Sequence, residues 1–193
     1  MSWILLSKKD YEEATIACQQ ALGISEKLLG PDNIDVASSM VNLATAYVNK
    51  GDIGMEPEVL LNKALTIYEQ KEIDYVYNAE ELKKLNFLKG SVEVSLGSLF
   101  YLRGNDTEAL RHYQISNLMF DNGTYNYVEA VQSLKNSALI LWRNNLNNEA
   151  EKLLAKALFK LETDEKYGIN HLKTKKVRNL LHSLREGKEA PLK

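Results

Sequence analysis

The chain has 193 residues, of which 45% are hydrophobic and 26% are charged, and this is the composition of a folded globular protein. Its formal net charge is −2, and it has no dense run of Lys and Arg, so nothing in its charge points to nucleic acid or an anionic membrane surface as the partner. Only three prolines occur, which leaves long stretches such as 126–161 open to uninterrupted helices.

Hydrophobic periodicity and turn signals predict an all-α chain without strands. Helices are expected, in chain order, over residues 1–7, 10–29, 35–50, 56–71, 79–103, 107–120, 126–144, 147–162 and 166–186. The first of these contains an apolar run of four residues, too short for a signal-peptide core, and no stretch is long enough to span a membrane. We expect a protein of the cell interior, cytoplasmic, with the mitochondrion as the alternative location.

The helix expected over 10–29 carries small residues at Ala14, Cys18 and Ala21. It is interpreted as the second helix of a repeat unit whose first helix, 1–7, is too short to be complete. The single cysteine has no internal disulfide partner, so Cys18 is expected to be a small buried residue.

The following helices repeat a pattern of small and large residues. Ala44, Gly97 and Ala138 each lie in the middle of an apolar helical pattern that ends in a turn signal. The next helix then carries a small, a large and a small residue at spacings of four and three, as in Ala109, Tyr113 and Ser116 and in Ala150, Leu154 and Ala157. Antiparallel helices approach closely where side chains are small, so the pattern predicts stacked helical hairpins.

The unit around Ala44 is irregular. Its second helix aligns through Leu61 and Ala64, which places Pro57 in the first helical turn, where proline removes no hydrogen bond. The spacing from Ala44 to Gly97 is longer than the next spacing, and the surplus residues, 71–90, are expected to form a lengthened helix or an inserted loop.

The last expected helix has one apolar side and one basic side. Its basic residues, Lys173, Lys175, Lys176 and Arg178, lie mostly opposite its leucines and are interpreted as a solvated face. A helix of this kind closes the open end of a helical stack.

These residues resemble a known family. The small-large-small spacing, together with Leu96, Gly97 and Phe100, is similar to the tetratricopeptide repeat (TPR) consensus, and segments 21–47 and 63–68 resemble the longer variant found in kinesin light chains. The resemblance implies a TPR-type solenoid of helical hairpins with a C-terminal capping helix. Its units are expected at 1–30 (an incomplete first unit), 31–71, 72–121 (with an inserted linker or extended helix), 122–163, and 164–193 (the capping helix and tail).

The resemblance also implies a binding groove. TPR arrays present the first helix of each pair on a concave surface, and in kinesin light chains asparagines one residue before a conserved leucine hold a peptide backbone there. The matching positions are Asn42 and Asn136, with Ser95 in place of a third asparagine. The neighbours expected on the same surface are Thr45, Asn49, Ser98, Tyr101, Lys135 and Arg143, of which Lys135 and Arg143 are expected to pair with an acidic ligand or a C-terminal carboxylate. Trp142 is interpreted as a core residue.

The sequence shows no catalytic or metal-binding motif. His112, His171 and His182 have no neighbouring cysteine and are interpreted as lone exposed or half-buried histidines. We therefore expect no enzyme activity, no cofactor and no bound metal.

The expected function is a non-enzymatic scaffold or adaptor that binds a peptide or partner helix of another protein. Two alternatives remain open: an assembly factor for a larger complex, of the mitochondrial respiratory-chain type, and the docking C-terminal part of a longer multi-domain protein. The open first unit, with Trp3, Ile4 and Leu5, also predicts end-to-end self-association.

Overall fold

The structure is a computed structural model that describes residues 8–74, 78–121 and 127–191, and within these ranges it contains helices and no strands. The helices are α1 (Lys8–Leu29), α2 (Ile34–Lys50), α3 (Met55–Asp74), α4 (Ala79–Leu102), α5 (Asp106–Asp121), α6 (Tyr127–Arg143), α7 (Asn147–Thr163) and α8 (Leu172–Arg185). The expected elements from 10–29 to 147–162 agree with these bounds to within three residues. The expected helix 1–7, with the apolar residues proposed for self-association, lies outside the described residues.

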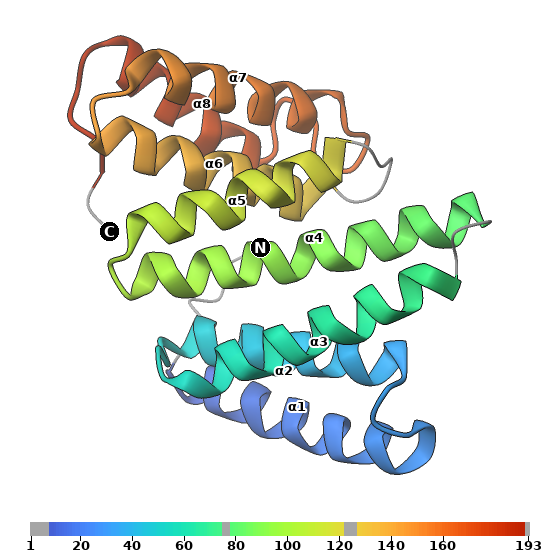
Figure 1. The fold of residues 1–193 in the computed structure, drawn as a ribbon. Coiled ribbons are helices and arrows are strands. Elements are labelled where there is room, and N and C mark those ends of the chain that lie inside the picture. Colours follow the sequence, from blue (N-terminus) through green and yellow to red (C-terminus); the bar gives the residue numbers. More distant parts are fainter. Residues whose placement is uncertain (1–7, 75–77, 122–126, 192–193) are drawn as a thin grey trace.

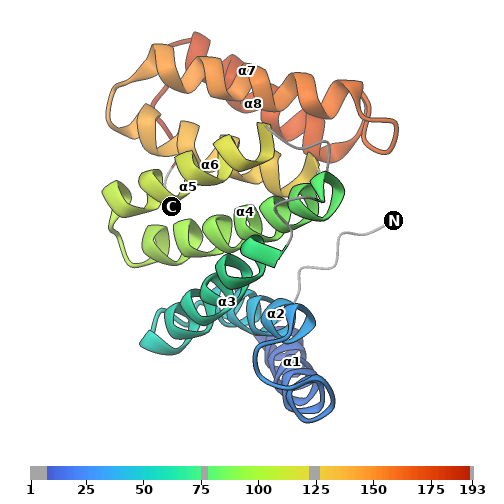
Figure 2. The ribbon, with the colours of Figure 1, turned by 45° about the vertical axis from the view of Figure 1, so that its right-hand side comes forward.

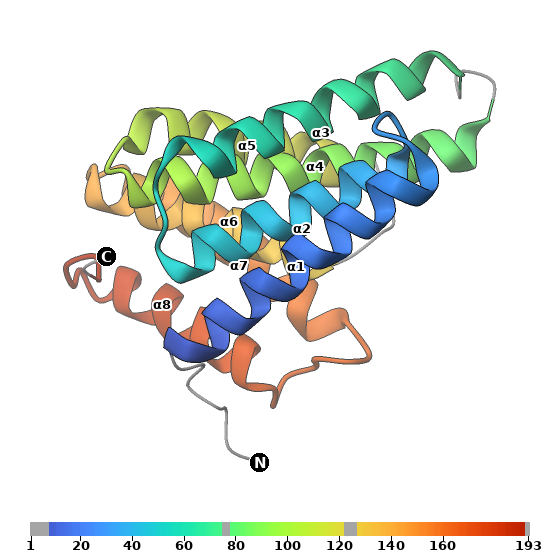
Figure 3. The same ribbon diagram turned by 90° about the horizontal axis from the view of Figure 1, so that it is seen from below.

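Consecutive helices pack as hairpins, α2 with α3, α4 with α5 and α6 with α7, and the hairpins stack on one another (Figure 1). At the ends of the stack, α1 packs on α2 and α8 packs on α7 (Figure 2). The helices α2, α4 and α6 also contact one another in succession, so the first helices of the three hairpins share one face (Figure 3). The chain is thus an all-α solenoid of helical hairpins.

The small residues of the repeat pattern lie where paired helices approach each other. Ala44, Gly97 and Ala138 are all buried. At Gly97, a Cβ would stand only 2.7 Å from the ring atom Cδ1 of Tyr113. The tyrosine ring therefore fills the space that a methyl group would need, and the expected role of small residues at these crossings is confirmed.

Of the surplus residues 71–90, the described residues 71–74 and 79–90 are helical. They extend the C-terminal end of α3 and the N-terminal half of α4, which begins after the N-cap Asn78. Lys89 Nζ lies 2.9 Å from Glu72 Oε2 and joins the two extensions. Gly90 allows the ring of Phe120 on α5 to pack directly against the α4 backbone.

The last helix begins six residues later than the expected start at 166, so that boundary is wrong. Residues 165–170 form turns instead, with Gly168 in the left-handed region at φ 62°. The helix begins only after His171, whose Nδ1 accepts a hydrogen bond from the Lys173 N–H and caps the first turn. From there its apolar side packs on the C-terminal core, with Val177 and Leu181 buried.

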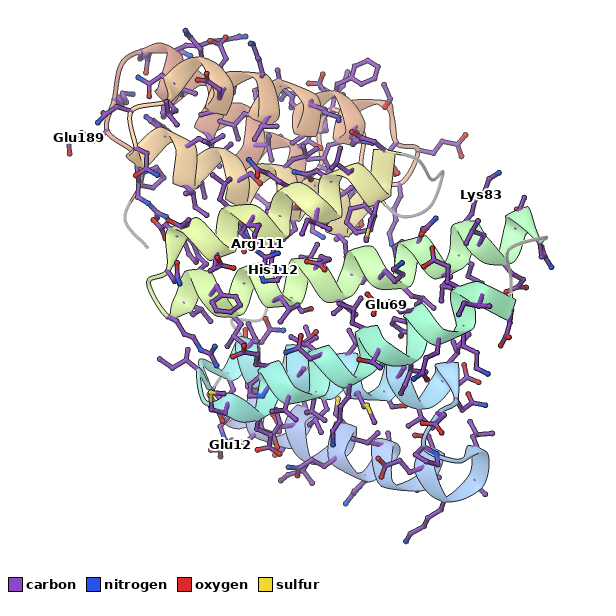
Figure 4. The ribbon with its side chains drawn as sticks, in the orientation of Figure 1. Glu12, Glu69, Lys83, Arg111, His112 and Glu189 are labelled. Atoms are coloured by element: carbon purple, nitrogen blue, oxygen red, sulfur yellow. The ribbon has the colours of Figure 1, made fainter. Side chains whose placement is uncertain are left out.

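A ladder of ion pairs links successive units along one edge of the stack. In each case a cation at the end of one helix meets a carboxylate near the start of the helix before it in the chain. The pairs are Lys50 with Glu12, Arg103 with Glu58, Arg143 with Asp106, and Arg185 with Glu151; Glu12 is labelled in Figure 4. Cations at helix C-termini and acids at N-termini also complement the helix dipoles, so the ladder stabilises both the helices and their stacking.

The interpretation of His112 as exposed or half-buried is wrong, because its side chain is only 8% exposed. Its Nδ1 lies 2.6 Å from Oε2 of the equally buried Glu93, and its ring stacks on Phe100. His112 is labelled on α5 in Figure 4. The pair is buried because α4 contacts α2, α3, α5 and α6, which leaves little of its surface in water. Cys18 is also less buried than expected, at an intermediate exposure beside the N-terminal core.

Candidate functional site: the groove of the first helices

A groove of about 530 Å³ lies between α2, α4 and α6, on the face that these first helices share. Its walls are largely apolar. The lining comprises Ser38, Val41, Asn42, Thr45, Val48, Asn49, Tyr68, Phe87, Leu88, Ser91, Val94, Ser95, Ser98, Val128, Glu129 and Gln132. Asn42, Thr45, Asn49, Ser95 and Ser98, which the sequence places in a groove, thus lie together.

The hydroxyl groups of the groove are already engaged within the protein. Thr45 Oγ1 on α2 and Ser95 Oγ on α4 lie 3.1 Å apart and join the two helices across the groove floor. Ser95 also donates to the Ser91 carbonyl, and Ser98 donates to the Val94 carbonyl. These groups hold the groove together, and they leave little unsatisfied hydrogen-bonding capacity for a ligand.

The amides of Asn42 and Asn49 have the opposite character. Both residues are exposed, and neither side chain makes a hydrogen bond to any described residue. They stand seven residues, about two helical turns, apart on α2, so both side chains point to the same side of the helix. An amide offers a donor and an acceptor, which is what an extended peptide backbone requires.

Asn136 faces a different environment from Asn42. Its Nδ2 donates to the hydroxyl of Tyr113 at 2.9 Å, and its Oδ1 accepts from Gln132 Nε2 at 2.9 Å. The same hydroxyl of Tyr113 lies 3.1 Å from Ser98 Oγ. Burial raises the pKa of Tyr113, and the bonds with Ser98 and Asn136 oppose that rise, so the phenol stays neutral and fixed between α4 and α6. Asn136 therefore links helices in the free protein.

Tyr101 and Arg143 also interact with each other. Arg143 Nη1 donates to the Tyr101 hydroxyl at 2.8 Å, and its guanidinium lies 4.9 Å from the centre of that ring. Its other amino group pairs with Asp106 at 3.1 Å. Arg143 thus belongs to the ion-pair ladder, and neither residue lines the groove.

Lys135 lies in a second pocket, of about 490 Å³, between α6 and α8. Leu139, Trp142 and Leu180 form the apolar part of its lining, and the segment after α8 crosses it, where the Trp142 indole N–H donates to the Lys188 carbonyl. Trp142 is buried, as the sequence indicated. Burial lowers the pKa of Lys135, and the charges of Lys176 and Lys173 lower it further.

One acidic residue of the groove has no partner among the described residues. Glu129, in the first turn of α6, is half-buried, and its Oε2 is shielded from solvent without any hydrogen bond. No described residue of the groove lining is a Lys, Arg or His. The carboxylate is therefore the single charge in a largely apolar groove.

Several groove residues were not anticipated from the sequence, chiefly Tyr68 and Glu129. Tyr68 comes from a second helix, α3, and its hydroxyl reaches Ser38 on α2 at 3.0 Å. The available signal is its position seven residues after Leu61, which puts it on the same buried side of α3. Glu129 gave no signal, because an acid in a first helical turn is usual.

The described residues contain no group of three or more His, Cys, Asp or Glu side chains placed to hold a metal ion. None of the helices in the described ranges combines the length and hydropathy needed to cross a membrane.

Residues 4–70 match the family model of the tetratricopeptide repeat. The match covers about a third of the chain and supports a tetratricopeptide repeat protein. The matched family is compatible with the kinesin-light-chain-like variant of the repeat. The hairpins beyond the match continue the same pattern of small and large residues, so the whole described chain is a TPR-type solenoid.

No curated protein matches this chain. TPR proteins are generally non-enzymatic modules that bind other proteins.

Proposed function

We propose that this TPR protein is a scaffold or adaptor, without enzymatic activity of its own, that holds an extended peptide or a partner helix in the groove between α2, α4 and α6. One observation carries the proposal: two exposed, unengaged amides, Asn42 and Asn49, stand along a preformed apolar groove. Apolar walls supply binding energy and a few polar groups fix orientation, which is the usual composition of a recognition site.

The α6/α8 pocket extends this surface. Gln132 lines the groove and accepts a hydrogen bond from Lys135 Nζ at 3.0 Å, so the groove and the pocket adjoin along α6. Lys135, Lys173 and Lys176 form no ion pair with any described residue. In this proposal an acidic group of the partner lies against these lysines, because a carboxylate would relieve their mutual repulsion.

The test is affinity capture from cell extract with the variant Asn42→Ala, Asn49→Ala beside wild type. Its matched control is Asn62→Ala, Asn148→Ala, at exposed asparagines of α3 and α7 outside the groove. The proposal predicts partners that the control retains and the groove variant loses, with equal thermal stability in both. Equal capture by all three proteins would contradict it.

A further inference from the structure

We infer that the occupant of the groove presents a basic side chain, Lys or Arg, to Glu129. This inference rests on the proposed function, because it specifies the partner's chemistry at the same groove. The Glu129 carboxylate makes no hydrogen bond or ion pair with any described residue.

Glu129 stands out among the acids of this protein. The carboxylates of the ion-pair ladder meet cations, and even the buried Glu93 meets His112 Nδ1 at 2.6 Å. Glu129 has no hydrogen bond or ion pair with any described residue, although its Oε2 is removed from water. An unpaired carboxylate oxygen shielded from water is energetically unfavourable, and a cation in the groove would stabilise this carboxylate through its other oxygen, which is not shielded in the same way.

The surroundings of Glu129 favour a cation over a neutral donor. The groove lining includes Val41, Val94, Phe87 and Val128, and these apolar walls weaken solvent screening of the carboxylate. The described lining contains no other charge, so a carboxylate in this groove attracts a cation and repels an anion. Lys and Arg also carry long apolar stems, which suit the valine-rich wall while the charged end pairs with Glu129.

The position of Glu129 also separates it from the lysine pocket. Glu129 and Lys135 are six residues apart on α6, which is about 9 Å along the helix axis and about 120° around it. The surface that runs from the groove around α6 to the lysine pocket is therefore negative at the start of the helix and positive further along it. A segment that binds both sites has opposite charges in a fixed order, which gives the groove a means of setting its direction.

The test uses a random-peptide display library selected on the wild-type protein. Selected peptides are then measured by fluorescence polarisation against Glu129→Gln and against Glu149→Gln. Glu149 is a matched control, because it is the acid in the first turn of α7 but is exposed and lies outside the groove. The expected result is a Lys or Arg at one fixed peptide position, about tenfold weaker binding to Glu129→Gln, and unchanged binding to Glu149→Gln. A charge-reversed pair, Glu129→Lys with a peptide carrying Glu at that position, is expected to restore binding.

Two outcomes separate this inference from the proposed function. Peptides that lose binding to Asn42→Ala, Asn49→Ala but bind Glu129→Gln as well as wild type would overturn the role of Glu129 and leave the groove proposal intact. A selection that yields no peptide sensitive to either groove variant would overturn both. Circular dichroism melting of each variant confirms that the comparison is made between folded proteins.

Discussion

The α4/α5 and α6/α7 hairpins follow the same repeat pattern but fill their interiors with different chemistry. Where α6/α7 pairs Ala138 with Leu154, α4/α5 pairs Gly97 with Tyr113. The positions of the apolar Leu134 and Leu153 are occupied in α4/α5 by Glu93 and His112. The helix crossing therefore depends on the combined volume of facing residues and on satisfied polar groups, and not on particular residue types.

The polar filling of α4/α5 connects the core with the groove. Tyr113 reaches through the hairpin from α5 and bonds to Ser98 and Asn136, whereas a leucine at the same position of α7 ends within the core. Tyr113 thus holds the groove wall in place and also packs inside the α4/α5 hairpin. Substitutions in α4/α5 that copy the residues of α6/α7 test this comparison.

The largest change in the free energy of unfolding is expected for substitutions of the buried Glu93–His112 pair. His112→Leu or Glu93→Leu alone leaves one polar partner buried and unsatisfied, which is expected to lower the free energy of unfolding by about 3 kcal/mol. The double variant recreates the leucine pair of α6/α7 and is expected to lie within about 1 kcal/mol of wild type. Urea denaturation measures all three. If the double variant loses as much unfolding free energy as the two single variants together, a leucine pair cannot replace Glu93 and His112 in α4/α5, which would contradict the comparison with α6/α7.

The next effect is expected at the Gly97–Tyr113 contact. Gly97→Ala inserts a methyl group where the ring already lies, and the overpacking is expected to destabilise the protein by about 2 kcal/mol despite the better helix propensity of alanine. Adding Tyr113→Leu reproduces the Ala–Leu pair of α6/α7, so the double variant is expected to be more stable than the sum of the single effects by about 1 kcal/mol. Thermal and urea unfolding of wild type, the two single variants and the double variant give the coupling free energy between the two positions. A coupling free energy near zero would show that the added methyl group does not clash with the Tyr113 ring.

The ion-pair ladder predicts a smaller and graded effect. The Arg103 side chain is 19% exposed and also donates to the carbonyls of Ile53 and Gly54, whereas Arg185 is 56% exposed. Arg103→Ala is expected to cost about 2 kcal/mol and Arg185→Ala less than about 0.5 kcal/mol. Thermal melting at low and high salt measures the loss of stability in each variant. Equal losses in Arg103→Ala and Arg185→Ala would show that burial of the ion pair does not determine its contribution to stability.

The smallest changes in stability are expected for the two asparagines of the predicted peptide site, and they are expected to differ between Asn136 and Asn42. Asn136→Ala removes the bond to the Tyr113 hydroxyl and is expected to lower the free energy of unfolding by about 1 kcal/mol. Asn42→Ala removes no such bond and is expected to change stability by less than about 0.3 kcal/mol. Urea denaturation decides between them. Equal effects would mean that Asn136 is as unengaged as Asn42.

The sequence was sufficient for the repeat architecture because close helix crossings impose small residues at fixed spacings. The positions of Ala44, Gly97 and Ala138 follow directly from that constraint. The state of individual side chains did not follow, because it depends on helices far apart in the chain. Asn136 was expected to be available to a peptide, but its amide bonds to Tyr113 of another helix. His112 was interpreted as exposed or half-buried, since only the surroundings of α4 show that its side chain is buried beside Glu93.

The most direct test of the groove as the binding site is photo-crosslinking in cell extract. A photoreactive amino acid replaces Asn42, Asn49 or Asn62 in three separate proteins, of which the last carries it at an exposed position of α3 outside the groove, and crosslinked peptides are identified by mass spectrometry. The account predicts that one partner crosslinks at Asn42, that the same partner crosslinks at Asn49, and that it does not crosslink at Asn62. A partner captured from Asn62 and never from Asn42 would contradict binding in the groove.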